Sequence, residues 1–432
     1  MFKTLNNAWK IPELRKKLIF TVLVLLIYRI GNAIPVPFVN SDAMSAYFNG
    51  TLSNTILGLY NAMSGSAFSQ ASVLALGIQP YINASIIIQL LTIAIPALER
   101  WAKDEGEVGK KKIERLTRYS TVALGVLLGI AYYTMIKDQT AQMPNGTVQN
   151  VLDQKDAWSA IVIIAAFTAG SSIVMWMGEQ ITAFGIGNGI SMILFANIIA
   201  SLPGTANLLF GVGMFKWWVA AIIAVVLMLL IVFIVFINDA ERRIPIQYAK
   251  RVVGRKVYGG QNTNLPIKVA MSGVMPVIFA QSIASLPATI ATFTGKTSGA
   301  WYKHVWSSDS WVYIAVYGLL IFFFSWFYST IQYDPVEVSN NLKKNGGFIP
   351  GFRPGKPTAD FIKKVINKIV VFGAVYLAIV ALLPILGGKL VPGVSSLAIG
   401  GTSIIIIVGV ALETVKALET QMLMRHYKGF LD

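Results

Sequence analysis

The side chains that most often carry out catalysis or bind metals are scarce in this sequence. It contains no cysteine, so neither a thiolate nucleophile nor a disulfide can form. Its two histidines, His304 and His426, lie outside the long apolar runs. Metal sites and general-base sites need several such groups close together. The residue types therefore predict no catalytic site, no metal site and no cofactor.

One glycine-rich stretch has the composition of a phosphate-binding loop. Residues 185–190 read GIGNGI, but loops of that kind bind phosphate between a strand and a helix. Here the stretch lies between two long apolar runs. Glycines in such a setting allow close helix packing or a tight backbone bend, and we expect that role for them.

Arg29 is the clearest ionisable residue within a predicted membrane span. A charge at that depth costs about 3 kcal/mol unless it faces protein or water. We expect its side chain to point inward, either to bind buried carbonyl groups or to act in transport. Carriers coupled to protons or sodium ions usually need several such residues near the midplane, so the sequence disfavours that class.

The composition places these residues in a membrane protein. Of the 432 residues, 55% are hydrophobic and 13% are charged, and the mean hydropathy is +0.62. Soluble domains carry about 25% charged residues. Apolar runs of bilayer length predict an all-α polytopic fold with about ten spans, and the first run lacks a cleavage site and should be retained. The predicted spans are 18–38, 74–96, 117–136, 157–177, 182–202, 217–237, 268–292, 311–331, 366–387 and 396–415.

The basic residues are distributed unevenly among the connecting segments. Of the 36 Lys and Arg residues, 29 lie in the N-terminal segment, in loops 99–118, 238–268 and 332–368, and after residue 415. Only six lie in the opposite loops. This asymmetry follows the positive-inside rule, so both termini should be cytoplasmic. The net charge of +16 is mostly a topology signal, with contact to anionic phospholipids as a further role.

Two of the basic loops are long enough to do more than orient the chain. Loop 238–268 has seven basic and two acidic residues, and its RVVGRKVYGG stretch has the β-branched residues and glycines of a short hairpin. Loop 332–368 has seven basic and three acidic residues and exposes Arg353 in a PGFRPG turn. Such loops could dock a large polyanionic or acidic partner.

Residues 52–95 do not have the pattern of an ordinary span. The stretch is too long for one crossing, which takes roughly 20 apolar residues, and too polar for two. Its first half mixes apolar residues with Gly, Ser, Asn and Gln, and its second half carries Gly77 and Pro80 near the start. Irregular backbone at membrane depth occurs where it is buried in protein or lines a water-filled cavity. The stretch predicts a pore or a transport path.

A short motif occurs in both halves of the chain. Residues 77–84 read GIQPYINA and residues 273–280 read GVMPVIFA, so both follow the pattern G-x-x-P-x-x-x-A. The copies lie five predicted spans apart and would therefore run in opposite directions. Inverted repeats of this kind often form a substrate path at their interface. The match does not by itself establish a repeat, because Gly and Pro are common in membrane helices.

Several longer segments match one known family in order and spacing. Two of them, GIQPYINASIIIQLL (77–91) and WMGEQITAFGIGNGISMILFANI (176–198), resemble the signature segments of the SecY family, the central subunit of the bacterial protein-conducting channel. At residues 183–184, Ala-Phe replaces a pair that is commonly polar or charged in that family, which puts in doubt any partner contact at that corner. Further matching segments are RRIPIQYAKRVVGRKVY (242–258), NLPIKV (264–269), NLKKNGGFIPGFRPG (341–355) and GGTSIIII (400–407).

The resemblance implies an architecture for the whole chain. Two inverted five-helix halves, residues 1–210 and 211–432, would form a clamshell around a central hourglass pore. A short plug helix before the second span, at about residues 55–69, would close the external side. The implied plug positions are Leu57, Tyr60, Met63, Ser64, Gly65 and Phe68.

The resemblance also implies an aliphatic ring at the waist of the pore. A hydrophobic constriction stops ions by dewetting, yet its soft walls can fit around a passing chain. Ile78 and Ile82 are spaced i, i+4 and share a helix face, as are Ile190 and Leu194. Without the resemblance, such residues would be assigned to the core or to the lipid-facing surface. The implied ring is Ile78, Ile82, Ile190, Leu194, Ile278 and Ile406.

In this family the second and seventh spans form a lateral gate that parts to release apolar segments into lipid. Hydrogen bonds inside membranes contribute about 0.6 kcal/mol each on average, so a polar seam there could open when a signal sequence offers competing contacts. Ordinary helix packing is the alternative role. The candidate seam residues are Ser85, Gln89 and Thr92 on the second span and Gln281 and Ser282 on the seventh.

The implied partners follow from the same resemblance. SecE would clamp the two halves, SecG would be peripheral, and the SecA ATPase or a translating ribosome would dock on the basic loops. Signal sequences and unfolded polypeptides would be the substrates, at the bacterial plasma membrane. A small-solute transporter and a membrane-embedded enzyme are the other classes, and both lack the ionisable or nucleophilic residues they need. The expected docking residues are Arg353, Arg242, Arg243, Arg251, Arg255 and Lys256.

Overall fold

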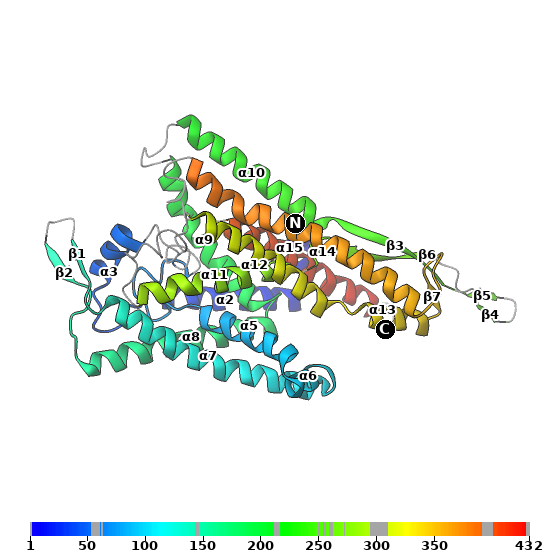
Figure 1. The fold of residues 1–432 in the computed structure, drawn as a ribbon, viewed down its shortest axis with the longest axis horizontal. Coiled ribbons are helices and arrows are strands. Elements are labelled where there is room, and N and C mark those ends of the chain that lie inside the picture. Colours follow the sequence, from blue (N-terminus) through cyan, green and yellow to red (C-terminus); the bar gives the residue numbers. More distant parts are fainter. Residues whose placement is uncertain are drawn as a thin grey trace.

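The structure is a computed structural model in which the described residues form an elongated bundle with ten long helices (Figure 1). Each of these helices overlaps one of the ten predicted spans. The residues that the structure describes are 2–52, 61, 64–142, 147–210, 217–248, 251–253, 256–258, 262–271, 273–293, 310–390 and 401–428. The long helices among them are α2 (Pro12–Gly31), α5 (Gln79–Ala94), α7 (Gly106–Ile136), α8 (Ala157–Phe184), α9 (Gly189–Phe210), α10 (Trp217–Asp239), α11 (Met275–Phe293), α12 (Trp311–Gln332), α14 (Lys356–Leu390) and α15 (Gly401–Lys428).

Within the described residues, six helices are long and apolar enough to cross a membrane, or seven if the bent pair α5 and α6 (Pro96–Lys103) is one span. The chain is therefore a multi-pass membrane protein, while the count of ten spans stays a prediction. α2 is too charged to qualify, since it contains the basic group at residues 15–17 and Arg29. The apolar stretches of α9 and α11, Gly189–Gly204 and Met275–Pro287, are too short to qualify.

The bend between α5 and α6 has a local cause. The chain direction bends by 107° between the two helices. Ile95, which precedes Pro96, has extended backbone angles (φ −110°, ψ 113°), as expected because a proline disfavours helical geometry in the residue before it. The apolar α5 therefore ends at Ala94, and the amphipathic α6 turns away and packs against α7.

A small core lies beside a hairpin at one end of the bundle, called the hairpin end below. The hairpin consists of β1 (Thr140–Gln142) paired antiparallel with β2 (Val148–Asn150). The short helix α3 (Ser41–Tyr47), followed by η1 (Phe48–Leu52), packs beside β1. Four aromatic rings in this core contact one another in a row, with neighbouring centroids 4.6 to 6.0 Å apart: Phe48, Phe68, Tyr132 and Phe167. Aromatic pairs add about 0.5–1.5 kcal/mol each beyond their buried area.

Several helices before residue 210 pack against helices after it. α9 packs against α15, and α11 packs against α5 and α7. The main hydrophobic cluster draws buried residues from α2, α5, α8 and α9 and from α10, α11, α12, α14 and α15. Its members therefore come from both predicted halves. The division at residues 210 and 211, and the inverted relation of the halves, remain predictions.

The two predicted basic loops fold together into one unit, called the basic-loop unit below. β3 (Glu241–Tyr248) lies between β6 (Asn262–Lys268) and β7 (Gly347–Phe348) in an antiparallel sheet. β3 and β6 belong to the first loop and β7 to the second, so backbone hydrogen bonds join the loops. The unit has its own hydrophobic core between the sheet, α13 (Pro335–Lys344) and the start of α14.

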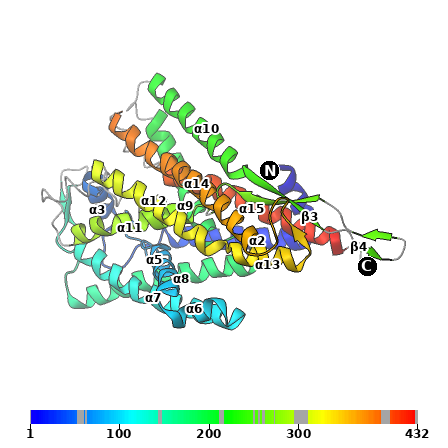
Figure 2. The ribbon, with the colours of Figure 1, turned by 45° about the vertical axis from the view of Figure 1, so that its right-hand side comes forward.

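The hairpin predicted from RVVGRKVYGG is confirmed. β4 (Arg251–Val253) pairs antiparallel with β5 (Lys256–Tyr258), with Arg251 opposite Tyr258. In both views this hairpin lies beyond the ends of β3 and β6 and extends away from the helical bundle (Figures 1 and 2). It is the most distant part of the basic-loop unit from the main hydrophobic cluster.

The two ends of the chain lie together near the basic-loop unit. The N-terminal helix α1 (Phe2–Lys10) packs against α15, and the Thr4 hydroxyl donates a hydrogen bond to Glu419 Oε1 at 3.2 Å. Three residues before Glu419 in α15, Lys416 Nζ lies 2.7 Å from the carboxylate of Asp239, the last residue of α10. The side of the membrane on which the termini lie stays a prediction.

Candidate functional site

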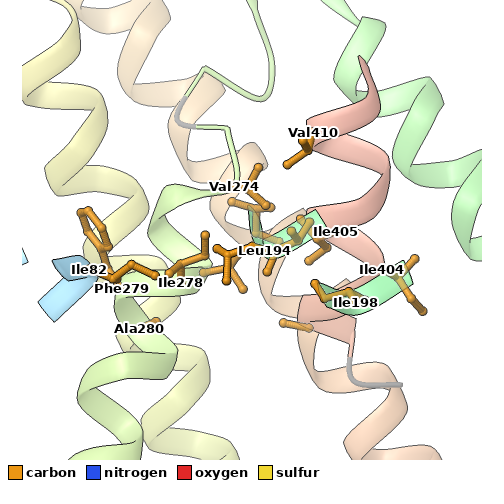
Figure 3. Packing of buried hydrophobic residues seen from close by; sticks show 14 of the residues in the cluster. Ile82, Leu194, Ile198, Val274, Ile278, Phe279, Ala280, Ile404, Ile405 and Val410 are labelled. Carbon is orange, nitrogen blue, oxygen red and sulfur yellow. The ribbon is translucent and has the colours of Figure 1, made fainter. Parts of the chain in front are cut away.

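The six predicted ring residues come together in one place. Five of them belong to the main hydrophobic cluster, each no more than 5% exposed, and Ile190 packs against that cluster while half-buried. In Figure 3, Ile82 of α5, Ile278 of α11 and Leu194 of α9 lie next to one another. The five buried members are Ile78, Ile82, Leu194, Ile278 and Ile406. Whether they act as a pore ring stays a prediction.

A glycine in α8 faces two of these residues. A Cβ atom on Gly178 would lie 3.5 Å from Ile78 Cδ1 and 3.7 Å from Ile190 Cγ1. Gly189, at the start of α9, is even closer to α8, because its Cβ would collide with the Gly178 carbonyl group. The prediction that the GIGNGI glycines allow close packing is therefore confirmed at Gly189.

The two copies of G-x-x-P-x-x-x-A adopt the same local backbone. Gly77 and Gly273 have φ angles of +53° and +58°, a region that favours glycine, and each lies two residues before a helix begins. The Gly77 N–H donates to the Leu74 carbonyl at 2.8 Å, and the Gly273 N–H donates to the Ala270 carbonyl at 3.2 Å. In both copies the proline is the second helical residue, where its missing N–H costs no bond. The sequence match therefore reflects a repeated structure.

This repeat identifies a member of the aliphatic cluster that the sequence analysis missed. Ile82 and Ile278 occupy equivalent positions in the two copies, and the equivalent of Ile78 is Val274. Val274 is 5% exposed and belongs to the same hydrophobic cluster. The signal was present in the aligned motifs, which place Val274 directly after the glycine, but the predicted ring did not include that residue.

The predicted gate helices α5 and α11 are in contact. Gln281 and Ser282 are buried, while Ser85, Gln89 and Thr92 are half-buried. Gln89 Nε2 donates to Ser85 Oγ at 3.3 Å, and Thr92 Oγ1 donates to the Gln89 carbonyl at 2.7 Å. These bonds run along α5 because a hydroxyl readily bonds the preceding turn of its own helix. The polar seam between the helices stays a prediction.

The predicted plug falls only partly within the described residues. Leu57, Tyr60 and Met63 lie outside them. Ser64 and Phe68 are buried, and Gly65 has a φ angle of +67°. The backbone from residue 65 to residue 70 forms turns, so the described end of the predicted plug helix is not helical.

Arg29 points into the protein, as expected. Its Nη1 atom donates a hydrogen bond to the Gly65 carbonyl at 3.2 Å. Close by, Asn32 Nδ2 donates to the Ser64 carbonyl at 3.2 Å. Of the two roles considered for Arg29, the bond to a carbonyl group is the one that the structure contains. The sequence analysis did not include Asn32.

Arg353 lies exposed in a turn that the fold holds firmly. Gly351 and Gly355 flank it with φ angles of +89° and +105°. The Arg353 carbonyl accepts a hydrogen bond from Thr358 Oγ1 at 2.8 Å, and the Gly355 carbonyl accepts one from Ser339 Oγ at 2.8 Å. The backbone of the turn is therefore fixed to α13 and α14, while the guanidinium group faces outward.

The other predicted docking residues lie in the same basic-loop unit where they are described. Arg242 and Arg243 are exposed on β3, and Arg243 Nε pairs with Glu241 Oε1 at 2.7 Å. Arg251 and Lys256 lie on the strands of the β4–β5 hairpin. Arg255 lies outside the described residues. The sheet thus brings residues from two separate loops into the basic-loop unit.

Among the described residues, no group of three or more His, Cys, Asp and Glu side chains could hold a metal ion. What the geometry does bring together is an aliphatic cluster between the helices, a turn segment held beside it and a basic unit at one end. These features define a multi-pass helical membrane protein with the components of a channel.

The comparisons with known proteins agree. A family model described as SecY matches residues 72–415, and the "Protein translocase subunit SecY" of Streptomyces scabiei is 43% identical over 437 residues, with 100% of both chains covered. The chain belongs to the SecY family.

Two solved structures share the fold. One is titled "The plug domain of the SecY protein stablizes the closed state of the translocation channel and maintains a membrane seal", with a TM-score of 0.61, 17% identity and 97% of both chains covered. The other is "Sec61 in the Canine ribosome-channel complex from the endoplasmic reticulum", with a TM-score of 0.62, 16% identity and 97% of both chains covered. At these identities the likeness concerns the fold.

Proposed function

We propose that this protein is a protein-conducting channel that passes unfolded polypeptides across a membrane. The observation that carries the proposal is the aliphatic cluster to which α5, α9, α11 and α15 contribute Ile82, Leu194, Ile278 and Ile406. Apolar side chains at a constriction exclude ions by dewetting and bind no passing residue strongly. Membership of the SecY family supports this function. A small-solute transporter fits less well, because it would need polar or ionisable groups at the equivalent place.

The contact between α5 and α11 supports a lateral gate. Both helices begin with the same Gly and Pro geometry, and both contribute to the aliphatic cluster. Parting them would open the cluster toward lipid. A signal sequence that binds only the open arrangement would shift the equilibrium toward it, so transmembrane segments could leave sideways. Ser85, Gln89, Thr92, Gln281 and Ser282 are the candidate polar residues of this gate.

We infer that the basic-loop unit docks the SecA ATPase or a translating ribosome. Its support is the exposed Arg353 on a fixed turn, together with the basic β3 strand and the projecting hairpin. Positive charge on such a surface favours association with a polyanionic or acidic partner. SecE and SecG are the further partners we propose. The excess of basic residues at this end supports a cytoplasmic location for both termini, in a bacterial plasma membrane.

The absence of cysteine from the sequence allows a direct test of the channel. Ile78→Cys supplies one thiol, and a secretory precursor stalled during transport supplies another. We expect a disulfide between them, because Ile78 would face the translocating chain. The matched control is Ile87→Cys on the same helix, whose side chain is 44% exposed on the bundle surface and should give no crosslink. Productive stalling without a crosslink at any of the six ring positions would refute the pore.

A further inference from the structure

The described end of the predicted plug, residues 64–69, is held by side chains from three other places in the fold. Four of its backbone carbonyl groups each accept a hydrogen bond from a side chain outside the segment. The bonds are Asn32 Nδ2 to Ser64 O at 3.2 Å, Arg29 Nη1 to Gly65 O at 3.2 Å, Tyr132 Oη to Phe68 O at 2.7 Å and Ser45 Oγ to Ser69 O at 3.3 Å.

These bonds divide the segment into a base and a turn. The base is Phe68 and Ser69, and its Phe68 ring is buried in the hairpin-end core against Tyr132, with centroids 4.8 Å apart. The turn is Ser64 and Gly65, and it is held from the end of α2 by Arg29 and from just beyond α2 by Asn32. The turn joins the base to the earlier residues of the predicted plug.

Gly65 fits the turn because it has no side chain. Its φ angle of +67° is in the left-handed region, where L-residues other than glycine are strained. A Cβ atom there would collide with Arg29 Nη1 and would lie 2.9 Å from Asn197 Oδ1. Alanine at this position would strain the backbone and displace the Arg29 guanidinium from its present contact with the Gly65 carbonyl.

The charge of Arg29 makes this contact costly to break. Among the described residues, no carboxylate lies within 4.0 Å of its guanidinium group, and its hydrogen bond goes to the Gly65 carbonyl. A charge at membrane depth without a polar partner is strongly disfavoured. Water that enters an open pore could replace the carbonyl as a partner. The dry, closed arrangement therefore favours the contact, and a hydrated path weakens it.

We propose that Arg29 and Asn32 form a latch that holds the plug in its closed position by fixing the Gly65 turn. This proposal rests on the channel function proposed above and assigns Arg29 and Asn32 as positioning residues, since they act on the plug backbone and not on the substrate. Opening exchanges the two carbonyl bonds for water, so binding of a signal sequence must supply the difference in free energy.

The test uses the full-length chain, purified with the subunits that accompany it and reconstituted into liposomes. Two variants break the latch from opposite sides: Arg29→Gln removes the charge, and Gly65→Ala displaces the guanidinium. A hydrogen bond to a charged group is strong, so its loss should destabilise the closed channel. The leak of iodide through the channel, measured without a precursor, should rise about tenfold or more. Both variants should also transport a precursor with a defective signal sequence better, relative to an intact precursor, than the wild type does.

The matched control is Ser159→Ala, which removes a buried hydroxyl that bonds the Asp156 carbonyl at 2.7 Å near the hairpin end. Its leak should equal that of the wild type. If one latch variant fails to fold, Asn32→Ala provides the second test. The latch would be overturned if its variants transport the intact precursor but show the wild-type iodide leak and the wild-type discrimination against the defective signal sequence. Failure of the wild type itself to transport an intact precursor would overturn the channel function instead.

Discussion

At the scale of single residues, the helices of this protein come close where glycine leaves the backbone bare. A Cβ atom on Gly189 would collide with the Gly178 carbonyl group, one on Gly170 with that of Val73, and one on Gly401 with that of Val380. At such contacts even one methyl group must move a helix, and overpacking typically costs about 1–3 kcal/mol. The approach of α9 to α8 lies beside the aliphatic cluster, since Gly178 faces Ile78.

Gly189→Ala should therefore separate the start of α9 from α8 and lower the melting temperature of the purified protein in detergent. The control is Gly204→Ala in the same helix, where a Cβ atom would have no neighbour within 4 Å. Alanine is favoured over glycine within a helix by about 0.5–1 kcal/mol, so the control should be neutral or slightly stabilising. Equal melting temperatures for both variants would show that the close contact is not a constraint.

At the scale of elements, the fold joins two separate loops into one unit, the proposed docking surface. β7 adds to β3, and the core of the unit buries Ile244, Ile246 and Ile349 against α13 and α14. The ring of Phe352 stacks on that of Phe361 with centroids 4.3 Å apart, next to the bonds that fix the backbone around Arg353. A fixed turn loses little entropy when it binds, which suits Arg353 for recognition.

Arg353→Glu should cripple translocation driven by SecA, because it places a negative charge at the centre of the proposed docking surface. Assembly should be unaffected, since the side chain is exposed. Lys344→Glu, at the end of α13 and also exposed, makes the same change of charge away from the turn and should have a much smaller effect. Transport rates of reconstituted variants measure this, and a wild-type rate for Arg353→Glu would contradict the assignment.

At the scale of the whole molecule, the bundle has two chemically different ends. One end carries the β1–β2 hairpin and the aromatic core. The other carries the basic-loop unit and, through the contact of Thr4 with Glu419, both ends of the chain. The aliphatic cluster includes residues from helices along the whole sequence. This polarity is what the positive-inside rule predicts for a protein oriented by its basic loops.

The orientation can be tested with single thiols, because the chain has no cysteine of its own. Asn7→Cys on α1 should react with a membrane-impermeant maleimide only in inverted membrane vesicles. Gln149→Cys on β2 should react only from the outside of intact cells. Both positions are exposed, so a missing reaction reports the side and not burial. Labelling of both from the same face would refute the proposed topology.

Much of this architecture follows from the sequence alone, because it depends on local patterns. Hydropathy predicted the ten long helices that the structure describes, and the β-branched stretch at 251–258 predicted the β4–β5 hairpin. The basic residues predict that both termini lie on one side of the membrane. The G-x-x-P-x-x-x-A motif predicted two matching helix starts, since Gly77 and Gly273 meet the same backbone requirement. The matching family segments indicated the aliphatic cluster, and the burial of Ile82 and Ile278 agrees with it.

Other features were decided only by the tertiary structure, because they join residues that are distant in the sequence. Sequence analysis expected Arg29 to face inward but could not identify Gly65 as its partner. It did not indicate Asn32, the membership of Val274 in the cluster, or the strand pairing of β7 with β3. Each depends on which backbone groups the packed helices bring within a few ångströms of one another. A sequence pattern records what a residue prefers, whereas these contacts depend on what the rest of the fold places beside it.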